Sequence, residues 1–337
     1  MQILHDYPLK SLNTFGIEAY AKEYVQVGDV SELKQILEFN RNKKKFILGG
    51  GSNMLLTKNI DALVININLK GIEVVDETTE SVIIKCGAGE TWHQLVMHCI
   101  NLGFGGLENL SLIPGNVGTA PIQNIGAYGV ELKDVFEKCQ TIHTKTGELR
   151  EFTKGECKFG YRESVFKNEL KGEYIITHVF LKLSKHGFHR LHTEYGAIRS
   201  KLEEFGKSPS IETISEAVIA IRKEKLPDPK EIGNSGSFFK NPVVSSEQYK
   251  KLLEKFPEIP SYPISDSEVK VPAGWLIEKA GFKGKTFGNY GVHKNQALVL
   301  VNYGGASGKE IFRLAKIIQA TIMRIFGISI TPEVNVI

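Results

Sequence analysis

The sequence predicts an α+β protein, and three observations favour that fold class. Residues 72–76 and 81–86 alternate between apolar and polar side chains around a short polar turn, which is typical of a β-hairpin. Apolar residues recur at helical spacing from Trp92 to Gly103, which indicates a helix. Three more strands follow, near 138–144, 148–152 and 174–183.

The remaining elements follow from capping signals and periodicity. Asp29 with Glu32, and Ser307 with Glu310, each resemble a capping box at the start of a helix. Helices are expected over 30–40, 214–225, 246–255, 273–280 and 307–326, and strands over 24–28, 46–48, 297–302 and 328–330. The segment from Lys201 to Ser210 is the best candidate for a linker.

Composition places the chain among ordinary globular proteins. Its 337 residues suffice for two or three domains, and 42% are hydrophobic and 24% charged. The net charge of +4 comes without a basic block, so nucleic acid is not an expected partner. Four cysteines without a C-x-x-C pair, no signal-peptide pattern and no apolar window of membrane-span length predict a cytoplasmic protein that does not insert into membranes.

A glycine triplet, Gly49-Gly50-Gly51, stands between the apolar segments 46–48 and 54–56. This strand–glycine turn–strand unit could be a tight turn only, or a nest of backbone N–H groups that holds a pyrophosphate together with Ser52 and Asn53. It is not a dinucleotide-binding fingerprint of the Rossmann type, because Met54 occupies the position of the third glycine.

A second unusual stretch runs from Lys225 to Pro242. Two prolines end a helix, glycines then permit a tight path past Ser237, and lysines and an asparagine flank that serine. This combination suits an anionic ligand. The glycine-dotted segment 105–129 is also long for a compact protein, which favours a functional loop.

Two charged residues have both a structural and a functional interpretation. Arg162 could be an exposed residue at a strand end, or a guanidinium that binds a carboxylate or an enolate. Glu333 could be an ordinary surface acid, or a site residue after a buried terminal strand. No metal site is predicted, since His186, His189 and His192 lack an acidic or cysteine partner.

Taken together, the motifs resemble the UDP-N-acetylenolpyruvoylglucosamine reductase family, in its longer, type I form, over nearly the whole chain. The resemblance lies in Asn13–Gly16, Gly49–Asn53, Gly87–Glu90, Ile113–Gly115, Pro121–Gly129, Phe159–Arg162, Tyr195-Gly196, Lys225–Pro229, Gly236–Pro242 and Pro332–Val334. It implies an FAD-binding region of the vanillyl-alcohol-oxidase type, in two parts over 1–70 and 71–205. A substrate-binding domain over 206–327 and a terminal strand over 328–337 near the active site would complete the fold.

The resemblance also implies a reaction. NADPH would reduce a non-covalent FAD, and UDP-N-acetylglucosamine enolpyruvate would then be reduced to UDP-N-acetylmuramate for peptidoglycan synthesis. Arg162 would bind the developing enolate, because a guanidinium is always protonated and binds two oxygens. Glu333 would assist as a neutral acid, and Ser237 would protonate the carbanion.

The binding residues come from the same resemblance. Those expected at FAD are Gly49, Gly50, Gly51, Ser52, Asn53, Pro114, Gly115, Gly118, Thr119, Gln123, Asn124, Gly126, Ala127 and Tyr128. Those expected at the substrate are Tyr161, Tyr195, Lys225, Asn241, Tyr262 and Lys270. The chain departs from the family at Ala120, where a small hydroxyl residue is expected beside the flavin.

Two other functions stay open at this point. A sugar or alcohol oxidase of the same superfamily would use oxygen and often bind flavin covalently through His or Cys. A nucleotide-sugar binding protein would bind without catalysis and be colourless. Either way, the expected ligands are small molecules and the chain is expected to be a monomer.

Overall fold

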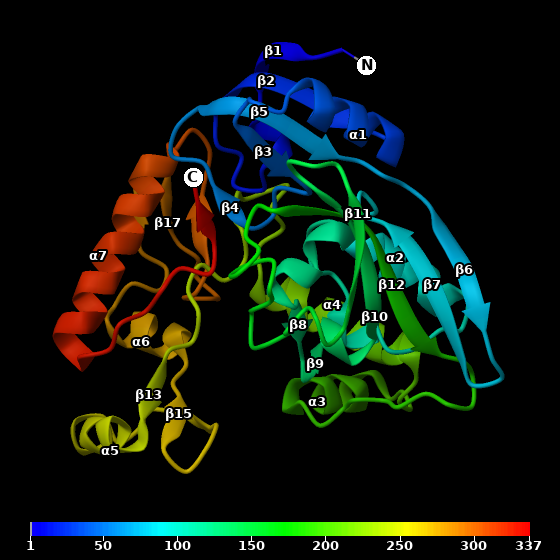
Figure 1. Cartoon of the computed structure of the whole chain (residues 1–337). Coiled ribbons are helices and arrows are strands. Elements are labelled where there is room, and N and C mark those ends of the chain that lie inside the picture. Colours follow the sequence, from blue (N-terminus) through cyan, green and yellow to red (C-terminus); the bar gives the residue numbers. More distant parts are fainter. Residues whose placement is uncertain (1) are drawn as a thin grey trace. The chain divides into compact units, whose positions relative to one another are not determined.

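The computed structural model describes residues 2–337 and divides into two compact units (Figure 1). The N-terminal unit comprises the residues up to Tyr7, Ala21–Gly50 and Ile60–Arg222. The C-terminal unit comprises Pro8–Tyr20, Gly51–Asn59 and Lys223–Ile337. Each unit is therefore built from segments that are far apart in the sequence.

The N-terminal unit contains a four-stranded sheet in the order β1-β2-β5-β3. Its strands are β1 (Leu4–Pro8), β2 (Tyr20–Val27), β3 (Lys45–Leu48) and β5 (Ile60–Ile67), and β5 pairs in parallel with both β2 and β3. Helix α1 (Val30–Phe39) packs its apolar face on this sheet (Figure 1). Its predicted cap is confirmed, because the Asp29 carboxylate accepts the N–H of Glu32 at 2.9 Å.

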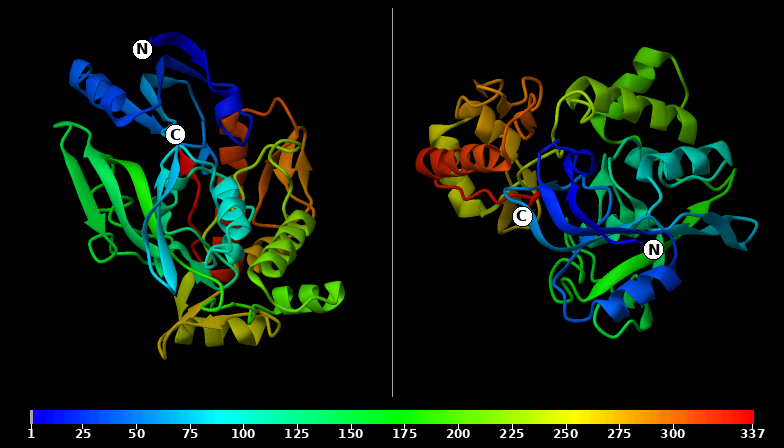
Figure 2. Two further views of the ribbon diagram at one scale, coloured as in Figure 1. Left: turned by 90° about the vertical axis from the view of Figure 1, so that its right-hand side faces the viewer. Right: turned by 90° about the horizontal axis from the view of Figure 1, so that it is seen from above.

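A five-stranded antiparallel sheet, in the order β11-β10-β12-β7-β6, holds the larger core of this unit. Its strands are β6 (Ile72–Glu77), β7 (Ser81–Gly87), β10 (Phe136–His143), β11 (Leu149–Thr153) and β12 (Tyr174–Ser184). The predicted hairpin is β6–β7. Helix α2 (Trp92–Asn101) covers one face of the sheet, and Trp92, Leu95 and Cys99 are fully buried there (Figure 2).

The predicted functional loop 105–129 contains three short 3₁₀ turns and one short strand. They are η2 (Glu108–Leu110), η3 (Val117–Thr119), η4 (Pro121–Gln123) and β8 (Gly126–Ala127), which pairs with β9 (Val130–Glu131) before the turn η5 (Leu132–Asp134). Leu112, Asn124 and Tyr128 have left-handed backbones, which non-glycine residues seldom adopt. The segment is thus ordered by its surroundings rather than by regular structure.

Two helices complete the N-terminal region, α3 (Gly196–Phe205) and α4 (Ile211–Lys225). The predicted linker over Lys201–Ser210 is wrong, because its first half belongs to α3. Ile198 and Leu202 of α3 are buried against α4, so this amphipathic segment gains its stability from packing.

The C-terminal unit is built from short strands and three helices. One sheet has the order β16-β17-β18 and a second the order β13-β15-β14. The elements are η1 (Lys10–Leu12), β13 (Val243–Ser245), α5 (Ser246–Lys255), β14 (Tyr262–Pro263), β15 (Glu268–Lys270), α6 (Ala273–Lys279), β16 (Thr286–Phe287), β17 (Tyr290–Val292), β18 (Leu300–Asn302) and α7 (Gly308–Phe326). In addition, β19 (Asn335–Val336) pairs in parallel with β4 (Met54–Leu55).

The predicted terminal strand over 328–330 is wrong, since the only strand assigned after α7 among the described residues is β19. The segment before β19 still lies in the core, because Ile328 and Ile330 are buried. It pairs irregularly with the chain after Ser237 through an isolated bridge between Phe239 and Pro332. Proline has no N–H to donate to a ladder, which explains why no continuous strand forms.

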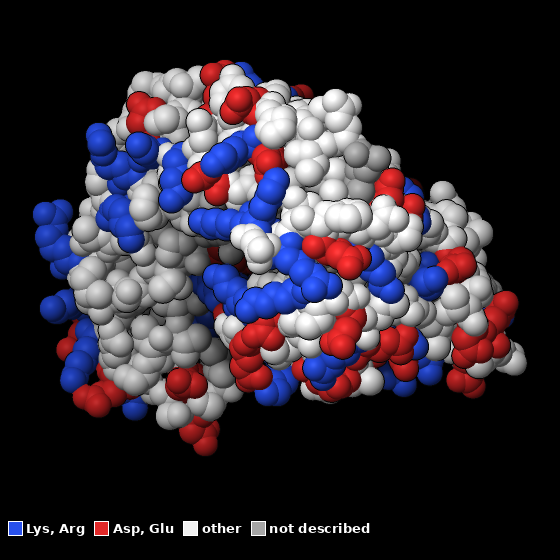
Figure 3. All heavy atoms as spheres, turned by 45° about the horizontal axis from the view of Figure 1, so that its top comes forward, with Lys and Arg blue, Asp and Glu red and all other residues white. Residues whose placement is uncertain are grey.

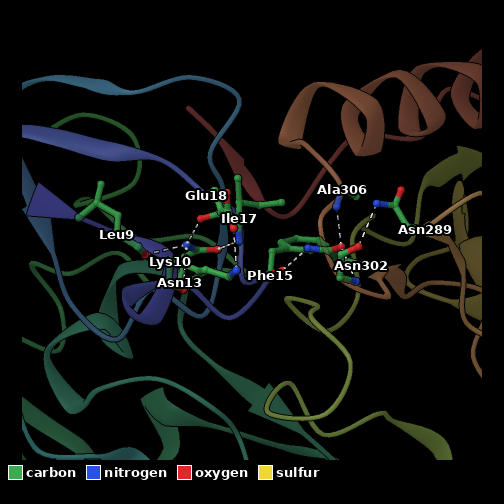
Figure 4. Close-up of polar contacts among 10 residues, drawn as sticks. Leu9, Lys10, Asn13, Phe15, Ile17, Glu18, Asn289, Asn302 and Ala306 are labelled. Atoms are coloured by element: carbon green, nitrogen blue, oxygen red, sulfur yellow. Dashed lines mark hydrogen bonds and ion pairs between the residues drawn. The ribbon is translucent and has the colours of Figure 1, made fainter.

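Two buried asparagines fasten the segment Pro8–Tyr20 within this unit (Figure 4). Asn13 donates to the carbonyls of Leu9 and Ile17 and accepts the N–H of Ile17, at 2.8 to 3.0 Å. Asn302 donates from its amide to the carbonyl of Phe15 at 2.8 Å. The motif at Asn13–Gly16 therefore has a structural role here, in which one side chain closes its own loop.

The start of α7 gives a direct test of the capping prediction. The Ser307 hydroxyl faces the Glu310 N–H at 3.3 Å, and the Glu310 carboxylate accepts the Ser307 N–H at 2.8 Å. We expect Ser307→Ala to lower the free energy of unfolding by about 1 kcal/mol, because the cap is lost. Urea denaturation would measure this, with Ser329→Ala at an exposed position as the control. Equal stability of both variants would contradict a role for the cap.

Charged side chains of both signs are interspersed on the face that Figure 3 displays. Surface ion pairs such as Lys10 with Glu18 at 2.7 Å are solvent-exposed and contribute little to stability. Among residues 2–337, no helix is long and apolar enough to cross a membrane.

Candidate active site

The glycine turn in the N-terminal unit lies against the loop 113–119. A Cβ added to Gly49 would stand 2.5 Å from the Thr119 methyl carbon, and one added to Gly50 would stand 2.7 Å from the Asn116 Oδ1. Both distances are shorter than any side chain tolerates. The two segments therefore approach so closely only because both positions are glycine. Two of the predicted flavin-binding motifs thus lie side by side.

The same loop is held by backbone bonds to the start of α2. The Trp92 N–H donates to the carbonyl of Gly115, and the Val117 N–H to that of Glu90, at 2.9 and 2.8 Å. A Cβ at Gly118 would lie 2.4 Å from that of Ala88. The motifs at 87–90 and 113–119 therefore form one closely packed backbone surface in the N-terminal unit, with Ala120 buried beneath it.

Arg162 is directed toward this loop. Its Nη2 donates to the carbonyl of Gly126 at 2.5 Å, and its own backbone is left-handed with φ of 57°. The side chain is half-buried, and the Lys167 ammonium donates to the Arg162 carbonyl at 2.8 Å. A strained arginine held in this way is more than an exposed residue at a strand end, which favours the functional interpretation.

Other predicted residues of the N-terminal unit differ in character. Asn124 is fully buried, and its amide bonds Glu131, Gly160 and the Lys133 N–H, so we expect it to shape the loop rather than to touch a ligand. The rings of Tyr128 and Tyr195 meet edge to face at 5.5 Å. Burial raises the pKa of the Tyr128 hydroxyl. Tyr161 and Tyr195 are exposed.

In the C-terminal unit, Gly51 is a position that only glycine can occupy. Its φ is 60°, and a Cβ would stand 1.9 Å from the carbonyl oxygen of Leu12. Asn53 donates to the carbonyl of Glu333 at 3.4 Å, and Asn335 donates to that of Asn53. The end of the glycine motif is therefore bonded to the segment that carries the predicted acid.

Ser237 and Glu333 belong to adjacent segments of the C-terminal unit. The Glu333 N–H donates to the carbonyl of Phe238 at 2.8 Å, and Ser237 forms a bridge with Val299 on its other side. Gly236, with φ of 67°, turns the chain immediately before the serine. Ser237 and Glu333 are both half-buried. Two of the three predicted catalytic residues are thus brought together.

Two predicted substrate residues also meet. Tyr262 and Lys270 are direct partners across β14 and β15, so their side chains share one face of that sheet. Asn241 instead accepts the N–H of Ala273 at 2.9 Å, at the start of α6. Lys225, the last residue of α4, is exposed. Among the described residues, no group of His, Cys, Asp or Glu could hold a metal ion.

Sequence reasoning missed Asn116 and Ser235. Asn116 faces Gly50 in the close contact described above, and it directly follows the Pro114-Gly115 pair. Ser235 is buried, and its hydroxyl lies within hydrogen-bond distance of the Thr14 hydroxyl and the Met54 carbonyl. Its position between Asn234 and Gly236 was the signal that could have found it.

The residues of the N-terminal unit fit an FAD pyrophosphate. A Cβ at Gly49, Gly50 or Gly118 would collide with the opposing segment, and Gly115 has a positive φ of 114°, so these glycine-bearing loops pack closely together. Glycine-rich loops of this kind can present backbone N–H groups to a pyrophosphate. Residues 21–153 match the family model described as FAD binding domain, and residues 228–337 match the C-terminal domain of UDP-N-acetylenolpyruvoylglucosamine reductase.

Curated relatives extend this likeness to the whole chain. A UDP-N-acetylenolpyruvoylglucosamine reductase of Flavobacterium johnsoniae is 59% identical over 338 residues and covers 100% of both chains. The chain belongs to the UDP-N-acetylenolpyruvoylglucosamine reductase family. A relative in this family from Pseudomonas aeruginosa is 46% identical, with 97% of this chain and 96% of the relative covered.

Solved structures confirm the predicted fold. The reductase of this family from Thermus caldophilus has a TM-score of 0.69 at 24% identity, and covers 99% of this chain and 98% of its own. The 6-hydroxy-D-nicotine oxidase of Arthrobacter nicotinovorans has a TM-score of 0.53 at 13% identity, with 97% and 86% covered. The predicted α+β architecture, with an FAD-binding domain followed by the C-terminal domain of the family, is thereby confirmed.

Proposed function

We propose that this chain reduces UDP-N-acetylglucosamine enolpyruvate to UDP-N-acetylmuramate, with NADPH as the donor, in peptidoglycan precursor synthesis. Family membership over the full length supports the reaction. The observation that carries the assignment of the site is that Ser237 and Glu333 lie on adjacent segments of the domain matched to the family. The proposal of three domains over 1–70, 71–205 and 206–327 remains a prediction.

FAD, when bound, supplies the hydride that reaches the terminal vinyl carbon of the substrate. Negative charge then develops on the neighbouring carbon and its carboxylate, and Arg162 is the residue proposed to meet it. The Arg162 Nη2 donates to the carbonyl of Gly126, and a planar, always protonated guanidinium is suited to binding the two oxygens of a carboxylate or an enolate. Preorganised donors of this kind stabilise a developing oxyanion most effectively.

Ser237 is proposed to protonate the carbanion. A hydroxyl is a weak acid, but a carbanion is a strong enough base to accept its proton. The turn at Gly236 and the bridge to Val299 fix the serine backbone, so the hydroxyl is left only the staggered rotamers about one Cα–Cβ bond. Glu333 is proposed to share charge with the enolate as a neutral acid, and its side chain is half-buried.

Lys225, Tyr262 and Lys270 are proposed to hold the diphosphate and uridine. We expect Lys225→Ala to raise KM more than it lowers kcat, because its charge contacts phosphate equally in the ground and transition states. Steady-state kinetics would measure both constants. Lys223→Ala, an exposed lysine of the same helix, is the matched control. A fall in kcat at constant KM would reject the assignment.

FAD is proposed to bind without a covalent bond. All four cysteines are unpaired and buried in the core of the N-terminal unit, and burial raises the pKa of Cys86 and Cys99. Acid precipitation of the purified protein should therefore release the yellow colour. A pellet that keeps the colour would point to an oxidase, and a colourless protein that FAD cannot reconstitute would point to a binding protein without catalysis.

The experiment that tests the reaction as a whole follows the visible spectrum. Anaerobic NADPH should bleach the flavin band, and the enolpyruvate substrate should restore it with formation of UDP-N-acetylmuramate. Reoxidation by air but not by substrate would reject the reductase. The chain is further proposed to be cytoplasmic, which its free thiols support. It is also proposed to be a monomer, which light scattering would test.

A further inference from the structure

Leu112 is held in a conformation that leucine avoids. Its φ is 59°, in the left-handed region, where the side chain of a non-glycine residue crowds its own backbone. It stands directly before Ile113-Pro114-Gly115, at the start of the loop 113–119 that contacts Gly50. Such a conformation persists only when neighbours impose it.

One neighbour is His93, on the first turn of α2. The Leu112 N–H donates to the Nδ1 of His93 at 3.0 Å. Trp92, the preceding residue, donates its indole N–H to the carbonyl of Leu110 at 3.0 Å and its backbone N–H to that of Gly115 at 2.9 Å. The start of α2 therefore bonds the loop before, at and after Leu112.

The other neighbour is Arg222 of α4. Its Nε donates to the carbonyl of Leu112 at 3.3 Å, and its guanidinium interacts electrostatically with the Tyr128 hydroxyl, whose pKa it lowers against the larger effect of burial. Tyr128 is also left-handed, with φ of 52°. A single arginine thus connects two strained residues that stand on either side of segment 113–127. That segment holds most of the residues proposed to contact FAD.

We propose that His93 and Arg222 are positioning residues for FAD, which hold Leu112 in its left-handed conformation and so set the path of segment 113–127. The inference rests on the proposed FAD site. Neither residue needs to touch the cofactor. Each acts through a backbone group of Leu112, one on its N–H and the other on its carbonyl.

The test at His93 separates a positioning role from a structural one. His93→Asn keeps an acceptor at about the reach of Nδ1, whereas His93→Gln keeps the polarity but places its acceptor farther out. Apoprotein would be titrated with FAD, with quenching of flavin fluorescence as the signal and thermal unfolding of the apoprotein measured beside it. His98→Gln, at an exposed position of the same helix, is the control.

We expect His93→Gln to weaken FAD binding about tenfold, because segment 113–127 would then lose its conformational entropy only when FAD binds. His93→Asn and the control should bind FAD within about threefold of the wild type. The asparagine keeps an acceptor for the Leu112 N–H, and the control leaves His93 unchanged. The unfolding temperatures of the apoproteins should differ little. Equal affinities of the Asn and Gln variants would overturn the role of His93.

Arg222→Lys provides the second arm, because one ammonium cannot reproduce the planar fork that reaches both Leu112 and Tyr128. We expect weaker FAD binding and a shifted flavin absorption band, whereas Arg313→Lys, at an exposed position, should change neither. When Arg222→Lys is combined with His93→Gln, the loss of FAD affinity should be smaller than the product of the two single losses, because both residues act through Leu112. Multiplicative losses would overturn the shared mechanism. Failure of the wild type to bind FAD would instead reject the proposed function.

Discussion

Ser237→Ala is expected to separate the two halves of the reaction. Reduction of the flavin by NADPH should keep a near-normal rate, because that step protonates no carbon. Reduction of the enolpyruvate substrate should slow at least about a hundredfold, which is typical of a missing general acid. Stopped-flow absorbance would follow each half separately.

The control for this variant is structural. Ser237 is half-buried, and removal of its hydroxyl should change stability by about half a kilocalorie per mole or less, as at most surface positions. Ser267→Ala, at an exposed position, should leave both half-reactions unchanged. Equal slowing of both halves would mean that Ser237 shapes the pocket, and the proton donor would then have to be sought elsewhere.

Glu333→Gln is expected to slow enolpyruvate reduction by about two to three orders of magnitude, since the amide keeps shape and a donor but can neither share nor transfer a proton. The backbone bonds of Glu333 to Phe238 and Asn53 do not involve its side-chain oxygens, so folding should be preserved. Single-turnover kinetics would measure the loss. Turnover like that of the wild type would show that Glu333 is structural.

The two catalytic variants can also be combined. If Ser237 and Glu333 act on the same developing charge, the double variant should be little slower than the slower single variant, because residues that act as a unit are not additive. Glu254→Gln, at an exposed position, serves as the matched control. Fully multiplicative losses would mean that the two residues act in separate steps.

Local signals in the sequence predicted the elements that depend on neighbours along the chain. The capping residues Asp29 and Ser307 and the hairpin β6–β7 were all found because their partners lie within a few residues. Strand β5 was missed, since a buried parallel strand pairs with distant segments and has no local partner. Helix α3 was interpreted as a linker because its charged face outweighed the two buried apolar residues.

The site shows the same division. The glycine motif was recognisable, because only glycine tolerates the approach of the Leu12 backbone at Gly51, and a Cβ at Gly49 would collide with the Thr119 side chain. The residues that hold the loop at Leu112 could not be recognised in the sequence. No residue type marks a left-handed leucine, and its partners His93 and Arg222 stand far from it along the chain. Asn124 and Asn241 were predicted as ligand contacts, yet their bonded atoms hold a loop and a helix start, a use that composition cannot distinguish.

The pairing of β19 with β4 has a consequence for the making of the protein. Asn335 and Val336 are synthesised about 280 residues after Met54 and Leu55. Because the C-terminal unit needs both, together with the segment Pro8–Tyr20, it cannot be completed before Val336 has left the ribosome. Its early segments must wait until then, exposed to chaperones and proteases, and a messenger truncated before codon 335 would yield a chain whose early strand β4 never finds its partner.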